Sequence, residues 1–505
     1  MRRVLAAAFA VAVVLPVCFA SADPLRLGVA DDWPKFHPCG DVWWQSAMDI
    51  GYTDLRMTVQ WDDTTPTTIP FQANLQAAVD CALLANIRPI LAIYPLRPNG
   101  VGGHVVRQQE FASFVGLVGT AFPNVKNFVI GNEPNVNRFW QPQFRNGHDA
   151  AAADYEHTLA AAYDELKTVR PDAIVWGPAI SSRGNDNPHA ISNPSHSPVW
   201  FIKDLGDAYR ASHRAKPIFD VFDLHPYPPV QDTAPLLTPF RWPQADAANL
   251  DRIKQALWDA FNKTAQPIVR SVPGVYSLPI ALDEVGQQTF VTGHEAAYAD
   301  PPENVYPITE AQQASSYVSL ADLAACDPSV SVVLYFPLID DTSLAQGFQS
   351  GSLYADLTHK ASYAAMKHEV AVARSAACAT SADVGAPAVW RHTTGVVGAS
   401  ASFGRLGTRP AVSSLRARTG IAPLRTVVTA DEDASFSAVL RKVGGGPVGK
   451  PLKGAVKAYR KTPIVFKGAL RPGRYVLRIV LSALTNPGRR TTFTSKPFVV
   501  RKPAR

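Results

Sequence analysis

Residues 25–375 alternate between short apolar runs and amphipathic segments. The apolar runs are rich in β-branched residues, and most precede a segment with apolar residues at helical spacing. Eight runs occur, at residues 25–31, 54–61, 88–95, 125–133, 173–180, 221–227, 279–285 and 330–339. Amphipathic helices are clearest over residues 150–169, 312–325 and 361–377. Eight strands alternating with helices predict an α/β fold, a (β/α)8 TIM barrel.

The C-terminal part has a different pattern. Short β runs at 412–418, 425–430, 435–442, 464–467, 475–482 and 491–500 are separated by turns rich in Gly and Pro. This spacing predicts a small all-β sandwich of the immunoglobulin or fibronectin type. Residues 379–408 are rich in Ala, Ser, Thr and Gly, and we interpret them as a linker or loose strand. The predicted units are a barrel over 23–378, a linker over 379–408 and a β-sandwich over 409–505.

The first 22 residues have the features of a signal peptide. Two arginines precede an apolar stretch over residues 4–19, and Ala20-Ser21-Ala22 matches a cleavage site. We therefore expect export, with the protein secreted or associated with the cell surface.

Four cysteines follow the predicted signal peptide, and in an exported chain they indicate two disulfides. Proximity in sequence favours Cys39 with Cys81 and Cys326 with Cys378. The other two connectivities remain open.

Composition and charge narrow the possible functions. The chain is 47% hydrophobic and 18% charged, as in globular proteins. The net charge of +7 hides an asymmetry, because residues 381–505 hold 23 Lys and Arg but 4 Asp and Glu. Such a basic module is expected to bind an anionic cell-wall polymer, unless its charges serve only solubility. Nucleotide-binding glycine motifs are absent from the sequence, so nucleotide binding has no support there. We also expect no specific nucleic acid partner, because the basic residues of the C-terminal part are scattered over strands and turns with few interleaved aromatics.

Two glutamates close predicted strands of the barrel. Glu133 ends the fourth apolar run and Glu284 ends the seventh. Active sites of TIM barrels lie at these strand ends, and a pair of carboxylates there is suited to cleaving a glycosidic bond. Side chains alternate along a strand, so we expect only one of Asp283 and Glu284 to face the barrel mouth. Glu284 is the favoured nucleophile, and Asp283 is the alternative.

The segment Asn132-Glu133-Pro134 resembles the signature of clan A retaining glycoside hydrolases, nearest the cellulase-like family 5 and the xylosidase-like family 39. The resemblance covers roughly residues 25–375. It implies that Glu133 is the acid/base and Glu284 the nucleophile, with no metal or organic cofactor. Further residues of the sequence match clan positions or are expected to bind substrate: Arg56, Asn132, His225 and Tyr227.

Two positions depart from the clan pattern. Phe336 stands where the clan usually has a Trp, and Tyr94 stands where family 5 usually has a His. Both changes concern sugar binding rather than the reaction. Because sugars stack on aromatic rings, we also expect Trp33, Trp140 and Trp242 to contact substrate.

These observations predict a secreted, monomeric, retaining β-glycosidase acting on a β-linked oligo- or polysaccharide. In such an enzyme the two carboxyl groups lie about 5–5.5 Å apart. Two alternatives remain open: a catalytically weak carbohydrate-binding barrel, and a transglycosylase at the cell surface.

Overall fold

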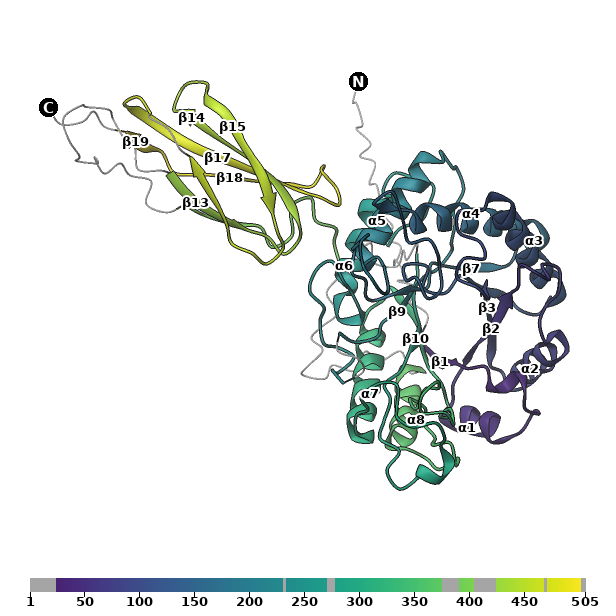
Figure 1. Cartoon of the computed structure of the whole chain (residues 1–505). Helices are drawn as coiled ribbons and strands as arrows, with labels where there is room; N and C mark the ends of the chain where they lie inside the picture. Colours follow the sequence, from purple (N-terminus) through teal and green to yellow (C-terminus); the bar gives the residue numbers. More distant parts are fainter. Residues whose placement is uncertain are drawn as a thin grey trace, which may run out of the picture.

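A computed structural model describes residues 24–229, 233–269, 278–374, 390–403, 424–466 and 470–500 (Figure 1). The predicted signal peptide, Cys378 and the β run at 412–418 lie outside the described residues. None of the described helices is long and apolar enough to cross a membrane.

The first domain is the predicted barrel. Its parallel sheet contains β1 Arg26–Ala30, β2 Asp54–Trp61, β3 Arg88–Pro95, β4 Asn127–Ile130, β7 Ile174–Trp176, β8 Ile180–Ser181, β9 Phe222–His225, β10 Ile280–Val285 and β11 Val330–Tyr335. The strand order is β7-β4-β3-β2-β1-β11-β10-β9-β8, and a parallel bridge between Trp176 and Val221 closes the ring. The sequence predicted one strand over 173–180. It is divided because Pro178 has no N–H for the ladder and Ala179 has a positive φ of 51°.

Helices surround the sheet (Figure 1). They are α1 Val42–Ile50, α2 Gln72–Leu84, α3 Val105–Ala121, α4 Ala151–Val169, α5 Pro198–Ala211, α6 Leu250–Phe261, α7 Glu310–Cys326 and α8 Ala361–Arg374. A short hairpin, β5 Phe144–Arg145 and β6 His148–Asp149, precedes α4. The three helices predicted most clearly correspond to α4, α7 and α8.

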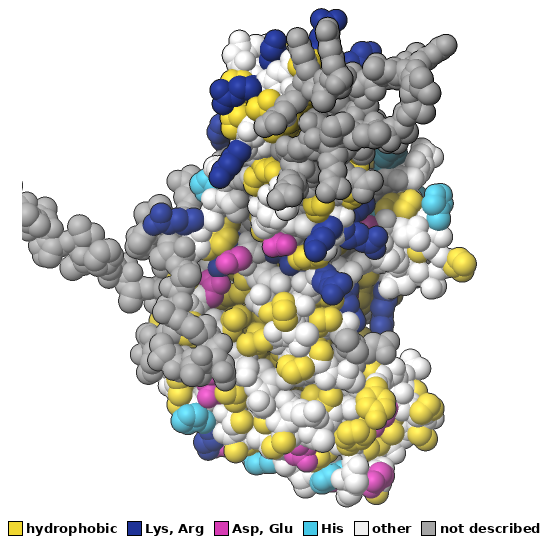
Figure 2. Space-filling view, turned by 90° about the vertical axis from the view of Figure 1, so that its left-hand side faces the viewer, with side chains coloured by type: hydrophobic (Ala, Val, Ile, Leu, Met, Phe, Trp, Pro, Cys, Tyr) yellow, Lys and Arg dark blue, Asp and Glu magenta, His cyan; other side chains and the backbone are white. Residues whose placement is uncertain are grey.

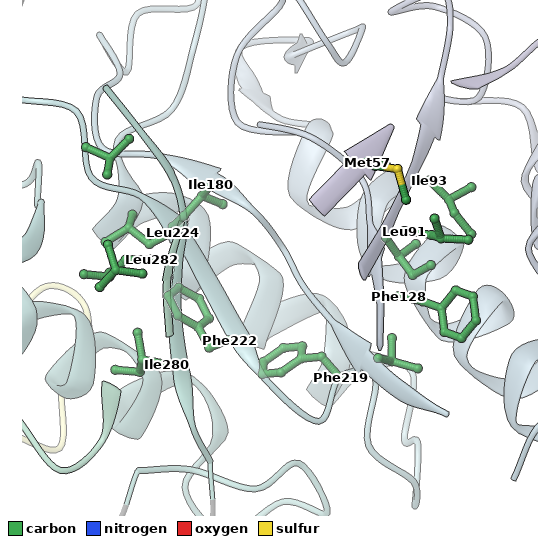
Figure 3. Close-up of a cluster of buried hydrophobic side chains, with 14 of the residues drawn as sticks. Met57, Leu91, Ile93, Phe128, Ile180, Phe219, Phe222, Leu224, Ile280 and Leu282 are labelled. Atoms are coloured by element: carbon green, nitrogen blue, oxygen red, sulfur yellow. The ribbon is translucent and has the colours of Figure 1, made fainter. Parts of the chain in front are cut away.

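Strand side chains alternate between two layers. On β3, Leu91 and Ile93 belong to the outer core that packs against the helices, part of which is seen in Figure 3. Ile90 and Ala92 belong to a separate cluster inside the barrel. The next inward position is Tyr94, which lines a cavity at the carboxyl end of the strands. The inner apolar layer therefore lies directly beneath the polar residues of the cavity.

One predicted disulfide is confirmed. Cys39 is bonded to Cys81 of α2. Cys326 is also disulfide-bonded, and its predicted partner lies outside the described residues.

The second domain consists of two antiparallel sheets with a shared apolar core. One sheet contains β12 Ser400–Phe403, β13 Leu424–Thr429 and β16 Thr462–Phe466. The other contains β14 Ala434–Lys442, β15 Pro447–Val456, β17 Gly473–Ala483, β18 Arg490–Thr494 and β19 Phe498–Val500. β12 lies inside the predicted linker, so part of that segment is a strand. β15 was missed because it is an edge strand, largely exposed and rich in Gly, Pro and Lys.

The β domain contacts the outside of the barrel at α6. Arg489 pairs with Asp259 of α6 at 2.9 Å and with Glu432 of its own domain, and all three side chains are almost fully buried. The ring of Trp258 stacks on His392 at 4.2 Å. Figure 2 shows Lys and Arg side chains, in dark blue, over the upper part of the face where this domain lies.

A buried acid at the start of α4 makes stability depend on pH. Asp149 accepts a hydrogen bond from the Ala152 N–H at 2.9 Å, and its other oxygen lies 3.3 Å from His196 Nδ1. His196 Nε2 lies 2.9 Å from the Gln143 carbonyl oxygen. Because a carbonyl oxygen can only accept, Nε2 must carry the hydrogen. Burial raises the pKa of Asp149 to about 8 and lowers the pKa of His196. The directions of both pKa shifts favour a protonated Asp149 beside a neutral His196.

We expect the free energy of unfolding to contain an Asp149 contribution that weakens as pH rises. The folded-state pKa lies above the unfolded value of 3.8, so this contribution is complete below about pH 4 and is lost as pH passes about 8. Urea titrations of wild type and Asp149→Asn from pH 5 to 9 isolate it. As pH rises toward 8, the free energy of unfolding of wild type should fall relative to that of Asp149→Asn, by up to about 1.4 kcal/mol per pH unit. A constant difference would mean that Asp149 is ionised throughout.

Candidate active site

A cavity of about 680 Å³ opens at the carboxyl ends of the barrel strands. Seven of the residues predicted from the sequence meet there, and five of them carry polar groups: Arg56, Asn132, Glu133, Tyr227 and Glu284. His225 lies fully buried beside them and contacts both glutamates. The fold thus gathers residues from β2, β9, β10 and the segment after β4 into one site.

A β-bulge turns two consecutive acids of β10 inward. Between Leu282 and Val285 the pairing of β10 with β11 shifts register. Arg56 consequently reaches both acids, with Nε 3.2 Å from Asp283 Oδ2 and Nη1 3.1 Å from Glu284 Oε2. Of the two, Glu284 lines the cavity, whereas Asp283 is fully buried. The expectation that only one of the two acids faces the barrel mouth is confirmed, and that acid is Glu284. The bulge breaks the strict alternation, so the buried Asp283 also lies within reach of Arg56.

Glu284 is held by two donors. Arg56 Nη1 donates to Oε2 at 3.1 Å, and the Tyr227 hydroxyl donates to Oε1 at 3.0 Å. The two donors therefore fix the orientation of the Glu284 carboxyl group, which lines the cavity.

Glu133 stands on unusual backbone. Its φ is 41°, in the left-handed region that costs a non-glycine residue about 1–3 kcal/mol. Its N–H donates to the Ala179 carbonyl at 2.8 Å, which holds this conformation. Gly131, two residues earlier, has a φ of 99°, and a Cβ there would lie 2.8 Å from the Tyr155 ring. The chain therefore leaves β4 through a tight turn that these contacts hold in place, and the turn directs Glu133 toward the cavity.

His225 connects the two glutamates. Its Nδ1 lies 3.0 Å from Glu133 Oε1 and 4.0 Å from Glu284 Oε2, and its Nε2 lies 3.4 Å from Asp283 Oδ1. Burial by itself lowers the pKa of His225, but the charges of Glu284 and Asp283 outweigh it and raise that pKa well above its usual value. The ring is therefore an imidazolium, and both of its nitrogens are donors. Sharing one nitrogen also keeps the two glutamates close together.

Arg56 orients Asn132 as well as Glu284. Its Nη2 donates to Asn132 Oδ1 at 2.9 Å. Burial opposes the charge, but Asp283 and Glu284 raise the pKa of Arg56 above its ordinary value. Because Asn132 Oδ1 is the acceptor in this contact, the group that Asn132 offers to a ligand is its Nδ2 amide.

Asp223 is a buried residue of the site that the sequence analysis missed. It accepts a hydrogen bond from the Ala179 N–H, the residue whose carbonyl holds Glu133. Burial, and then the charge of Asp283, raise the pKa of Asp223 well above its usual value. The sequence could have indicated this residue, because side chains alternate along β9 and Asp223 therefore shares the inward face with His225.

Two of the predicted aromatic residues line the cavity. Trp33 stacks on His37 with ring centroids 3.9 Å apart, and its Nε1 donates to Asp41. Phe336 packs edge-on against Phe348 at 5.0 Å. Tyr94 also lines the cavity.

The other two predicted aromatics are not in the cavity. Trp140 is 2% exposed and packs against Tyr155 in the core, while the preceding Phe139 faces the cavity instead. Trp242 lies in a separate pocket between the barrel and the β domain, where its N–H contacts the Tyr459 hydroxyl at 3.4 Å. Both predictions are wrong, because loop residues have no periodicity that indicates their direction.

Loops supply further cavity residues that the sequence analysis did not single out. They include Phe36, Arg138, Phe139, Arg183 and Phe348. Within the described part of the chain, no group of three or more His, Cys, Asp or Glu side chains is arranged to hold a metal ion.

Solved structures with a similar arrangement of the chain include glycoside hydrolases. A family 39 glycoside hydrolase from Bacteroides cellulosilyticus WH2 is 14% identical, with a TM-score of 0.48 over 88% of this chain and 82% of that one. A monomeric β-xylosidase from Caulobacter crescentus CB15 is 12% identical, with a TM-score of 0.45 over 92% and 98%. No family model matches the sequence, and no curated protein matches it significantly.

Proposed function

We propose that the protein is an exported, retaining β-glycosidase that cleaves O-glycosidic bonds of a β-linked oligo- or polysaccharide. The observation that carries the proposal is the pair of glutamates from opposite parts of the barrel, Glu133 and Glu284, which face one cavity and share contact with His225. Their environments differ. Glu284 accepts hydrogen bonds from Arg56 and Tyr227, whereas the side chain of Glu133 is hydrogen-bonded to His225.

In the first step, the Glu284 carboxylate attacks the anomeric carbon as the bond to the leaving oxygen breaks. Glu133 gives its proton to that oxygen. Because Glu133 Oε1 accepts from His225, the proton to be transferred resides on Oε2.

In the second step, water attacks the glycosyl-enzyme. Glu133 removes a proton from that water, and the bond between Glu284 and the sugar breaks. The Asn132 amide donates to the sugar hydroxyl beside the reacting carbon, a contact that strengthens as charge develops. Arg56 supports this contact by fixing Asn132 Oδ1.

The substrate class follows from the lining of the cavity. Trp33, Tyr94, Phe139 and Phe336 offer aromatic surfaces on which the C–H faces of sugars stack. The basic β domain contacts α6 through Arg489 and contributes no residue to this lining. We propose that it binds an anionic wall polymer without taking part in catalysis.

The first product anomer tests the proposal. A panel of 4-nitrophenyl β-glycosides of common pentoses and hexoses is hydrolysed and followed by proton NMR. We expect the β-anomer to form first, before mutarotation. The α-anomer first would indicate inversion, and tight oligosaccharide binding without hydrolysis would favour a carbohydrate-binding barrel. A disaccharide formed in place of free sugar would indicate transglycosylation.

A further inference from the structure

Two arginines of the cavity have no acidic partner among the residues that the structure describes. Arg138 and Arg183 both line it, and neither guanidinium lies within 4.0 Å of a carboxylate among the described residues. Other barrel arginines, such as Arg56, Arg97 and Arg145, do form ion pairs. Arg138 lies beside the Phe139 ring, 5.6 Å from its centroid. The two side chains therefore present unneutralised positive charge to whatever enters the cavity.

Both arginines lie on the Glu133 side. Arg138 follows Glu133 by five residues, and Arg183 follows β8 by two. Asn135 joins the two loops, because its Nδ2 donates to the Ser181 carbonyl at 3.1 Å and to the Arg183 carbonyl at 3.4 Å. The backbone of Glu133 is bonded to the same segment at Ala179.

The opposite part of the cavity contains two acids. Asp341 follows β11, and Asp32 follows β1 and pairs with Lys35 at 3.0 Å. These neighbouring strands lie across the ring from β4 and β8. A negatively charged sugar is disfavoured near Asp341 and favoured near the arginines. The charge distribution therefore distinguishes the two ends of the cavity.

The mechanism assigns the arginine end to the leaving group. An acid/base residue must reach the glycosidic oxygen, and the leaving group extends from that oxygen away from the nucleophile. From Glu284 the leaving group therefore extends past Glu133, toward Arg138 and Arg183.

We propose that the leaving-group subsite binds a sugar that carries an anionic group, a uronate carboxylate, through Arg138 and Arg183. This inference rests on the proposed glycosidase function. A planar guanidinium matches a carboxylate in shape and forms two parallel, charge-assisted hydrogen bonds with it. The substrate would then be an acidic polysaccharide cut on the non-reducing side of a uronic acid.

A matched pair of substrates tests the proposal. Both are phenyl β-glycosides of the sugar hydrolysed fastest in the panel, one with a 4-carboxylate on the ring and the other with its neutral methyl ester. We expect wild type to have the higher kcat/KM on the carboxylate. In Arg138→Gln and Arg183→Gln, the ratio of carboxylate to ester should fall about tenfold, as for a lost charge-assisted hydrogen bond. Raising the salt concentration should lower the ratio in wild type.

The control is Arg441→Gln, which removes an exposed positive charge from the β domain and should leave both kcat/KM values unchanged. An equal preference for acid and ester in wild type, or an unchanged ratio in both cavity variants, overturns the anionic subsite and leaves the glycosidase proposal standing. Failure to hydrolyse either substrate overturns both. A 4-sulfonate analogue preferred over the carboxylate would overturn the uronate assignment in favour of a sulfated sugar.

Discussion

Glu284→Gln should lower kcat on aryl glycosides by at least about ten-thousandfold, the scale seen when a covalent nucleophile is removed. The substitution keeps the size of the side chain but removes the charge that attacks the anomeric carbon. It also replaces an acceptor of the Arg56 and Tyr227 hydrogen bonds with an amide. Because the lost interaction operates in the transition state, we expect kcat to fall far more than KM changes. Initial rates on the best 4-nitrophenyl glycoside provide the measurement.

Two controls separate chemistry from folding. Glu110→Gln changes an exposed carboxylate of α3 and should keep full activity. A 2-deoxy-2-fluoro glycoside with a good leaving group should label wild type once, and mass spectrometry should locate the label on Glu284. A label on Asp283 would identify that residue as the nucleophile instead, because the β10 bulge turns both neighbours to the same side of the strand.

The sequence predicted the regular parts of the barrel well. The apolar runs at 54–61 and 88–95 coincide with β2 and β3, because both strands are long and buried on both faces. Polar residues within or directly after such runs, Arg56 of β2 and Glu133 after β4, accordingly fall in the cavity. Burial makes a polar residue in an apolar strand costly, so its position carries information.

The rest of the site depends on departures from regularity. The bulge in β10 arises from pairing with β11, and strand periodicity cannot reveal it. The choice between Phe139 and Trp140 depends on how a turn after β4 folds, and the two side chains take opposite directions. Trp242 faces the β domain, a contact between segments 217 residues apart. Local patterns predict elements, whereas these positions are fixed by packing between elements.

Glu133→Ala should affect hydrolysis according to the leaving group. A poor leaving group, such as a sugar, needs protonation, and its release should slow by a factor of about a hundred to ten thousand, the usual range for general acid catalysis. A 2,4-dinitrophenolate leaves without a proton, so formation of the glycosyl-enzyme should be nearly normal. The intermediate should then accumulate, because Glu133 no longer activates water, and a burst of dinitrophenolate should precede a slow steady state.

Azide distinguishes the two glutamates. It is a nucleophile that needs no base, and the space left by the Glu133 side chain beside His225 Nδ1 admits it. We expect azide to accelerate the steady state of Glu133→Ala on the dinitrophenyl glycoside and to give a β-glycosyl azide. In Glu284→Ala, azide attacks the substrate directly and should give the α-glycosyl azide. If the β-azide came from Glu284→Ala and the α-azide from Glu133→Ala, the acid/base and the nucleophile would have to be exchanged, although Arg56 and Tyr227 donate to Glu284.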